Sequence, residues 1–171
     1  MRRTLALALL FPAGCGEDDS GQAPLPDGAW RDPACGLTWQ QEPGEAEFWN
    51  DAVAACEALD LAGGGWHLPD IGELRCLVLG CEATAPDGAC EVSADCPGLG
   101  CVTTACEGCE SGAGASEGCW WPEALGGACA EPLWSSTPLD EKRSWLIDFG
   151  SAALSADAIT EKHAVLCTRA D

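Results

Sequence analysis

Residues 49–80 read WNDAVAACEALDLAGGGWHLPDIGELRCLVLG, and this stretch contains the two clearest helix signals of the chain. Asn50 and Asp51 are good N-cap residues, and three apolar side chains then recur at helical spacing. These side chains belong to Val53, Cys56 and Leu59. Three consecutive glycines, residues 63–65, end the pattern. The stretch therefore predicts a first helix that begins near Asn50 and directs Cys56 toward the core.

The second half of the stretch carries a better-defined helix start. Asp70 and Glu73 have the spacing of a capping box, in which each side chain accepts a hydrogen bond from the backbone N–H of the other. An apolar face follows, and Gly80 can end the helix. This face consists of Leu74, Leu77 and Val78. A second helix is therefore expected between Asp70 and Gly80.

Near the C-terminus the pattern changes from helical to alternating. Trp145, Ile147 and Phe149 fall on one face of a predicted strand, and the turn at Gly150-Ser151 follows it. Further short strands are expected at residues 36–40, at residues 133–136 and around Val165 and Cys167. Helices early and strands late in a chain are typical of the α+β class.

The first fifteen residues have the features of a bacterial export signal. Arg2 and Arg3 are followed by an apolar run, and small residues stand directly before Cys15. This arrangement resembles a lipoprotein signal, in which Cys15 would be acylated and become the mature N-terminus, although Pro12 stands where Leu is usual. An ordinary cleaved signal with an unpaired cysteine nearby is the alternative. The apolar run is too short to cross a bilayer, which takes about twenty residues.

Three segments are expected from this organisation. Residues 1–14 form a signal peptide, and residues 15–28 form the lipidated cysteine and a flexible tether, rich in acids, Ser and Gly. Residues 29–171 have a length typical of one domain. By the sorting logic of lipoproteins, Gly16 in place of Asp favours the outer membrane of a two-membrane bacterium.

The charge balance limits the partners of this chain. Cleavage before Cys15 would leave six basic residues against 28 acidic ones, a formal side-chain balance of −22. Such a surface repels nucleic acid, anionic lipid headgroups and sulfated polysaccharides. We therefore expect no nucleic-acid partner, and contact with the membrane only through a lipid anchor at Cys15.

Besides Cys15, the chain contains twelve cysteines between Cys35 and Cys167, an even number that is suited to six disulfides. Disulfides are favoured in an exported chain because the periplasm and the cell surface are oxidising. The Cys106-x-x-Cys109 spacing would suggest zinc in a cytosolic protein, but no histidine occurs between Cys81 and Cys129. We expect no metal and no cofactor.

Several short motifs occur together over most of residues 29–171. They are Trp49-Asn50-Asp51-Ala52, Cys56, Leu59, Trp66-His67-Leu68-Pro69 and Glu73-Leu74 in the helical segment, Asp32 and Gly36-Leu37-Thr38-Trp39 upstream, and Trp134-Ser135-Ser136-Thr137, Trp145 to Phe149 and Cys167-Thr168-Arg169 downstream. In combination they resemble the C-terminal domain family named after the bacterial collagen-like protein Lcl. The resemblance implies a C-type-lectin-like fold, with two helices packed on twisted antiparallel sheets and the termini brought together.

The resemblance also implies one disulfide, between Cys56 and Cys167. Cys35 and Cys76 stand where the family pattern has no cysteine, and these two could pair with each other. Position 67, usually Arg in the family, is His67 here. Eight cysteines remain, and they allow 105 pairings; they are Cys81, Cys90, Cys96, Cys101, Cys106, Cys109, Cys119 and Cys129.

These eight cysteines lie in residues 80–132, a segment poor in core-forming residues that interrupts the resemblance. We call this segment the insertion. Four disulfides would give it shape, and loops held on a rigid scaffold are common binding sites. Trp120 and Trp121 are the candidate contact residues. The alternative is that both indoles cap the core beneath the loop.

Two other readings of the motifs are weaker. Trp49-Asn50-Asp51 spells a calcium-binding motif of sugar-binding C-type lectins, but here it precedes a helix and lacks the companion Glu-Pro-Asn or Gln-Pro-Asp. His67 and His163 could act as general bases near neutral pH, with Ser135 or Ser136 as a nucleophile. No Gly-x-Ser-x-Gly turn surrounds either serine. We expect no enzyme, although formylglycine-generating enzymes share the broad fold.

The leading functional hypothesis is therefore a surface-anchored binding or adhesion module that recognises a glycan or an exported protein through the insertion. The second hypothesis is an envelope lipoprotein with a structural role and no small ligand. Exposed indoles at Trp120 and Trp121 would favour binding, and buried ones would favour the structural role.

Overall fold

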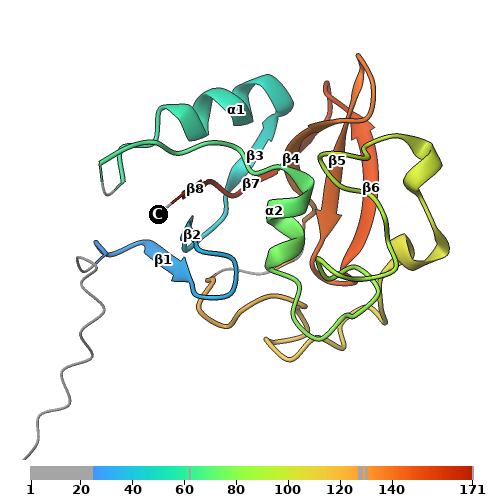
Figure 1. The fold of residues 1–171 in the computed structure, drawn as a ribbon. Coiled ribbons are helices and arrows are strands. Elements are labelled where there is room, and N and C mark those ends of the chain that lie inside the picture. The colour runs from blue at the N-terminus through green and yellow to red at the C-terminus, as the bar shows by residue number, and fades with distance from the viewer. Residues whose placement is uncertain (1–24, 62, 127–128, 130, 171) are drawn as a thin grey trace, which may run out of the picture.

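The computed structural model describes residues 25–61, 63–126, 129 and 131–170, which form two helices and two sheets (Figure 1). The predicted signal peptide and Cys15 lie outside the described residues. The elements are β1 Ala29–Asp32, β2 Leu37–Gln40, β3 Gly44–Phe48, α1 Trp49–Glu57, α2 Ile71–Cys76, the 3-10 helices η1 Leu99–Cys101 and η2 Thr104–Glu107, β4 Leu133–Pro138, β5 Arg143–Asp148, β6 Ala153–Ala158, β7 Lys162–Val165 and β8 Thr168–Ala170. Every helix among the described residues falls short of the length and apolarity that a bilayer span requires. The α+β class is confirmed.

Helix α1 follows β3 without a loop. Its N-cap is Phe48, which makes no side-chain capping bond, and Asn50 and Asp51 lie exposed in the first turn. The expectation that Asn50 or Asp51 caps this helix is therefore wrong. The reason lies in the preceding strand, because Phe48 is paired with Lys162 of β7 and the chain enters the helix directly from that pair.

Helix α2 begins with the predicted capping box. The Asp70 side chain accepts a hydrogen bond from the Glu73 N–H at 2.8 Å, and the Glu73 side chain accepts one from the Asp70 N–H at 2.8 Å. The Ile71 N–H donates to the hydroxyl of Thr137 at 2.9 Å, which ties the helix start to β4. The helix ends at Cys76, earlier than Gly80.

The two sheets differ in size and in the way they connect the ends of the domain. The smaller sheet has the strand order β1-β2-β8 and is antiparallel, so the first and last strands flank β2. The larger sheet has the order β3-β7-β4-β5-β6 and is antiparallel except for the pairing of β4 with β7. The described chain thus begins and ends in the same small sheet, as the resemblance implies.

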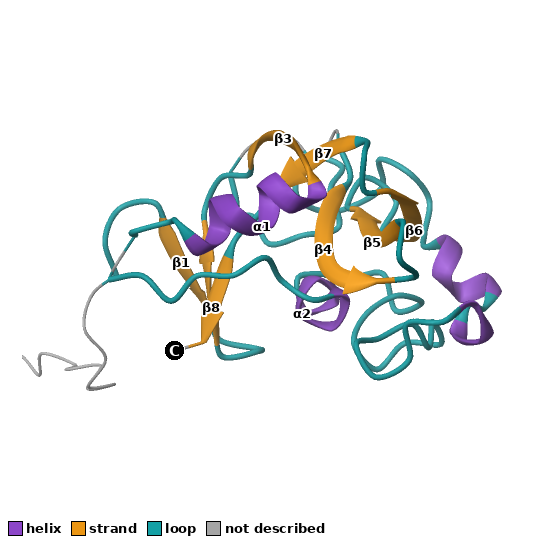
Figure 2. Ribbon diagram, turned by 90° about the horizontal axis from the view of Figure 1, so that it is seen from above, coloured by secondary structure: helices purple, strands orange, loops and turns teal. Residues whose placement is uncertain are grey.

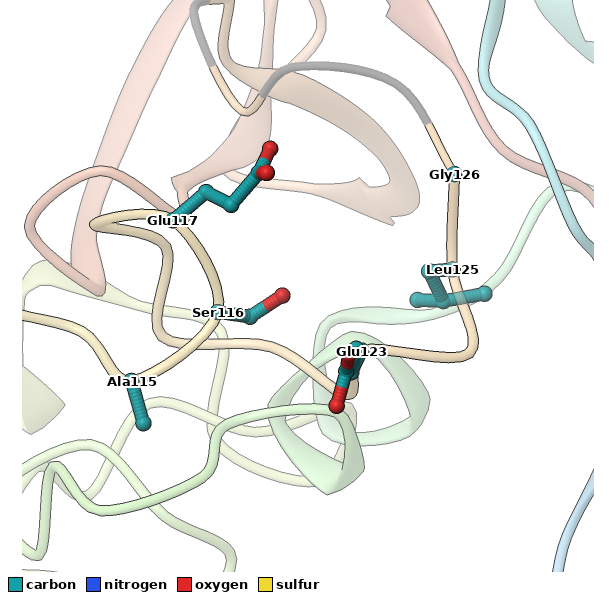
Figure 3. A pocket seen from close by; sticks show the side chains of 6 residues that line it. All are labelled: Ala115, Ser116, Glu117, Glu123, Leu125 and Gly126. Atoms are coloured by element: carbon teal, nitrogen blue, oxygen red, sulfur yellow. The ribbon is translucent and has the colours of Figure 1, made fainter.

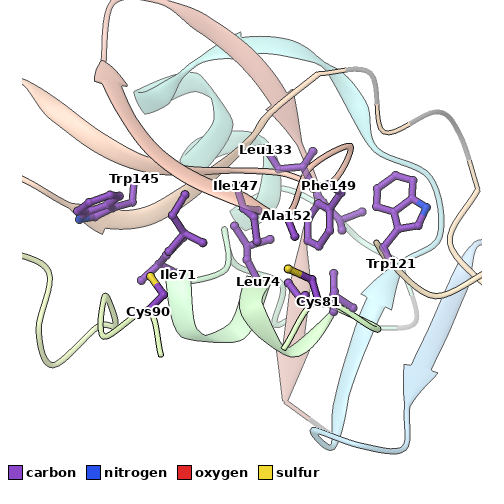
Figure 4. Close-up of a cluster of buried hydrophobic side chains, with 14 of the residues drawn as sticks. Ile71, Leu74, Cys81, Cys90, Trp121, Leu133, Trp145, Ile147, Phe149 and Ala152 are labelled. Carbon is purple, nitrogen blue, oxygen red and sulfur yellow. The ribbon is translucent and has the colours of Figure 1, made fainter. Parts of the chain in front are cut away.

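Strand β5 separates two clusters of buried side chains. Trp145 and Ile147 point into the larger cluster, with Phe149 just beyond the strand, against α2 and the insertion (Figure 4). Leu146 points the other way, into a cluster around α1 that contains Ala52 and Cys56. The predicted face is correct, and the opposite face is buried as well because α1 covers it.

Candidate functional site

The insertion is held by four disulfides of its own. They are Cys81–Cys109, Cys90–Cys106, Cys96–Cys101 and Cys119–Cys129. Two further bridges hold the scaffold, Cys56–Cys167, the pair that the resemblance implies, and Cys35–Cys76. Cys76 is the last residue of α2, so the second bridge joins this helix to the turn between β1 and β2.

Backbone hydrogen bonds attach the insertion to the turn between β5 and β6. The Cys109 N–H donates to the carbonyl of Ser151 at 2.7 Å, and the Gly112 N–H donates to that of Gly150 at 2.8 Å. The Trp120 N–H donates to the carbonyl of Phe149 at 2.8 Å. The insertion, which contributes Val92, Trp121 and Leu125 to the larger cluster, is in this way fixed to the β5–β6 turn.

A buried cation fixes the other side of the insertion. The guanidinium of Arg75, on α2, is 3% exposed and donates to the carbonyls of Thr84, Val92 and Ala85 at 2.9, 2.7 and 2.6 Å. Burial lowers the pKa of Arg75 from its ordinary value, and the negative charge of Asp87 opposes that change. Because the acceptors are backbone carbonyls, Arg75 fixes the path of the backbone here, and these bonds do not depend on the side chains of the insertion.

The two adjacent tryptophans have different environments. Trp121 is 3% exposed and packs against Phe149, with ring centroids 5.4 Å apart (Figure 4). Trp120 is half-buried, and its indole N–H donates to the carbonyl of Glu110 at 3.2 Å. Trp121 therefore belongs to the core and is not part of an exposed contact surface, contrary to the expectation that both indoles form one. Trp120 lies at the edge of the same cluster and packs against it, so both indoles contact the core and only Trp120 keeps part of its surface accessible.

Large apolar side chains are exposed elsewhere in the same region. Leu99 is 64% exposed and Val102 is 45% exposed, and both belong to the insertion. Leu79, directly before the insertion, is 50% exposed. The remaining large apolar side chain of this kind among the described residues is Phe48, whose ring lies beneath the ammonium of Lys162 at 4.8 Å. In the sequence, the exposure of Leu99 and Val102 is indicated only by their position in a segment where large apolar residues are rare.

The acidic residues of the insertion all lie on the surface. The segment contains no Lys, Arg or His. Its nine carboxylates are all exposed; they belong to Glu82, Asp87, Glu91, Asp95, Glu107, Glu110, Glu117, Glu123 and Glu131. The outer face of the insertion therefore combines negative charge with isolated apolar side chains.

A hollow of about 330 Å³ opens between two loops of the insertion (Figure 3). Ser116 and Glu117 come from one loop, and Glu123 and Leu125 come from the other. Among the described residues, no three His, Cys, Asp or Glu side chains converge in a way that could hold a metal ion.

Two neighbouring hollows, of about 230 and 500 Å³, lie beside the end of α1. Gln40 and Leu59 line both of them. Glu45 and Glu47 contribute carboxylates to the smaller hollow, and Asp27 and Glu42 contribute to the larger. The larger hollow borders the insertion, because the carbonyl of Gln41 accepts a hydrogen bond from the Gly126 N–H at 2.7 Å.

The candidate catalytic residues have structural partners. His67 Nε2 lies 3.1 Å from both carboxylate oxygens of Glu73, the residue that closes the capping box of α2. His163 Nε2 lies 3.0 Å from Asp157, and its ring meets the Trp134 ring edge-on at 4.7 Å. The Ser135 hydroxyl accepts a hydrogen bond from the Thr137 N–H at 3.2 Å. Within the described part of the chain, the hydrogen-bond partners of Ser135 are Thr137, Ser144 and Trp49 rather than either histidine.

The Trp49-Asn50-Asp51 motif also has a structural setting. The indole N–H of Trp49 donates to the carbonyl of Ser135 at 2.8 Å, which anchors α1 to β4. Asn50 and Asp51 point from the exposed first turn of this helix. The motif thus fixes the position of α1 on the larger sheet.

Comparison with known families identifies one match over nearly the whole described domain. The model of the Lcl C-terminal domain matches residues 28–169. The match includes the insertion, both helices and the two sheets. A search of curated proteins finds no match to this chain.

Proposed function

The chain belongs to the Lcl C-terminal domain family, and from this premise we propose that it is a non-enzymatic binding module whose insertion recognises a positively charged exported or surface protein. One observation carries the proposal. All nine carboxylates of the insertion are exposed and no basic residue accompanies them. A surface of one charge sign selects partners of the opposite sign and accelerates their approach.

The arrangement of the scaffold supports this role. The insertion is cross-linked internally by four disulfides and is attached to the scaffold by the Arg75 guanidinium and the backbone of the β5–β6 turn, so its surface is shaped before any partner binds. A preorganised surface loses little conformational entropy on binding. The structure of the insertion therefore supports binding by a preorganised surface, and not by a loop that becomes ordered when the partner binds.

The proposed site lies far from the entry of the chain. The described residues begin next to β1, and η1 and η2 lie at the opposite end of the domain in both ribbon views (Figure 1; Figure 2). Six disulfides are typical of a protein outside the cytoplasm. Acylation of Cys15, which lies outside the described residues, would anchor the domain in the outer membrane.

A protein partner is favoured over a glycan. Sugar sites usually present a flat aromatic ring, but Trp121 is buried and Trp120 is half-covered. A non-catalytic role is supported by the candidate nucleophile Ser135, which is fully buried and whose hydroxyl accepts the Thr137 N–H. The burial of Trp121 is also the observation that favours a second candidate function, that of a structural envelope lipoprotein without a ligand.

The test compares two variants, each of which loses three carboxylates, one from the insertion and the other from the scaffold. In the insertion variant, Glu107, Glu110 and Glu117 are replaced by Gln; in the scaffold variant, Glu45→Gln, Glu57→Gln and Asp60→Asn remove three exposed carboxylates around β3 and α1. The full oxidised chain is screened against a random-peptide phage library and a glycan array. We expect peptides rich in Lys and Arg whose binding weakens with salt and in the insertion variant alone. Equal weakening in both variants, or binding to glycans only, would contradict the proposal.

A further inference from the structure

Leu99 and Val102 form one exposed apolar knob on the insertion. Val102 N–H donates to the carbonyl of Leu99 at 3.3 Å, so the two residues close a 3-10 turn. Side chains three residues apart in such a turn lie on the same side. The knob is therefore a single apolar protrusion, and it is exposed although the apolar surface of a folded domain is preferentially buried.

The knob stands on a rigid base. The Cys96–Cys101 disulfide closes the loop that contains Leu99, and the Cys101 N–H donates to the carbonyl of Gly98 at 3.0 Å. The carbonyl of Pro97, in the same loop, accepts the indole N–H of Trp145 at 2.8 Å. Trp145 is buried in the core, so the position of the loop is fixed by β5. A flexible loop could fold Leu99 against the domain, but this one holds it in solvent.

Charge around the knob is negative. Asp95 stands directly before the loop, and Glu107 ends η2, which follows η1 in the chain and lies beside it in both views (Figure 1; Figure 2). Both carboxylates are exposed. An apolar anchor flanked by negative charges fits an apolar pocket that is flanked by positive charges.

From these observations we infer that Leu99 and Val102 are the anchor of the protein interface, and that they insert into an apolar pocket of a partner protein rimmed by Lys or Arg. This inference rests on the proposed binding function of the insertion and identifies the part of it that makes the central contact. A few residues packed in a desolvated pocket at the centre of an interface carry most of its affinity, although Leu and Val fill this place less often than Trp, Tyr and Arg. The charged rim sets specificity and the rate of association.

The test uses the peptides selected with the wild-type chain and a double variant, Leu99→Ser with Val102→Ser. Leu79→Ser is the matched control, because it removes a similarly exposed apolar side chain next to the insertion but outside the knob. Substitution of exposed side chains leaves the fold nearly unchanged in stability. Thermal unfolding of each variant verifies this, and peptide affinity is measured by isothermal titration.

The expected result is selected peptides that combine Lys or Arg with an apolar residue, together with an affinity loss of about tenfold or more in the double variant and no loss in Leu79→Ser. If the peptides bind the double variant as well as the wild type but lose affinity for the insertion variant, the knob is not the anchor, while the binding function stands. If no peptide is enriched, or if only glycans bind, both proposals fail.

Discussion

Arg75 Nη1 donates a hydrogen bond to the backbone carbonyl of Val92 at 2.7 Å, so a core helix and the insertion share one buried cation. The same guanidinium reaches the carbonyls of Thr84 and Ala85. A segment that contains no basic residue thus acquires its internal cation from α2. Its own carboxylates remain on the surface, where they are available to a partner.

Arg75→Met tests this dependence. The substitution keeps much of the side-chain volume but leaves the buried carbonyls of Thr84 and Val92 without a donor, while that of Ala85 keeps the Gly88 N–H. We expect a loss of about 3 to 5 kcal/mol in the free energy of unfolding, measured by urea denaturation.

Arg143→Met is the matched control for this prediction. Arg143 is exposed and pairs with Asp140 at 2.7 Å on the surface. Such an exposed pair contributes little to stability. Equal effects of the two substitutions would show that Arg75 does not organise the insertion.

The Cys56–Cys167 disulfide is expected to contribute more to the free energy of unfolding than the Cys96–Cys101 disulfide, because it closes a longer loop. It closes a loop of sequence separation 111, whereas Cys96–Cys101 closes one of separation 5. Chain-entropy reasoning gives about 4 to 5 kcal/mol for the long loop, an upper value because other bridges shorten it, and about 2 kcal/mol for the short one. Replacing each pair by two alanines should therefore lower the unfolding midpoint more for Cys56 and Cys167. The opposite order would refute the entropic explanation.

The features that sequence predicted well are those that depend on neighbouring residues. The capping box of Asp70 and Glu73 is a contact between residues three apart, and its signal is local. The alternation of Trp145, Ile147 and Phe149 likewise predicts a buried face without reference to the rest of the fold. Strand β6 had no such signal, because its residues 153–158 are mostly small and polar and it exists through full pairing with β5.

The features that could not be predicted from the sequence depend on contacts between segments that are distant in the sequence. The acceptors of Arg75 are backbone carbonyls, which every residue possesses, so no residue type marks them. The pairing of the eight cysteines in the insertion follows from its path in space. Trp120 and Trp121 are identical neighbours in the sequence, so the residue type does not tell which one packs against Phe149 and is buried.

Asp157 predicts a pH dependence of stability. The hydrogen bond from the Ala158 N–H lowers the pKa of Asp157 below its ordinary value; burial opposes this shift, and the contact with His163 adds to it. Because the folded-state pKa lies below the unfolded one, the stabilisation is fully present above the ordinary aspartate pKa of about 3.9 and is lost as the pH falls through the folded-state value.

The measurement for Asp157 is the urea midpoint of wild type and Asp157→Asn at pH 7 and at pH 3. We expect the wild type to be more stable at pH 7 and the difference to narrow at pH 3, with a small amplitude because the carboxylate is partly exposed. The exposed Asp60→Asn serves as the control and should show no narrowing. A difference of the same size at both pH values would exclude this linkage.

Gly108 lies directly against the backbone of the β5–β6 turn. We expect Gly108→Ala to separate the insertion from this turn. Its φ is +79°, and an added Cβ would lie 2.3 Å from the carbonyl oxygen of Ser151. Backbone strain and the clash together should cost about 3 kcal/mol or more. Gly98→Ala is the control, because its φ is −77° and a Cβ there meets nothing within 4 Å, so we expect a change within about 0.5 kcal/mol. Hydrogen exchange at the Cys109 amide, which donates to Ser151, should accelerate in Gly108→Ala alone. Unchanged protection of that amide would mean that the insertion is not held to the hairpin at this point.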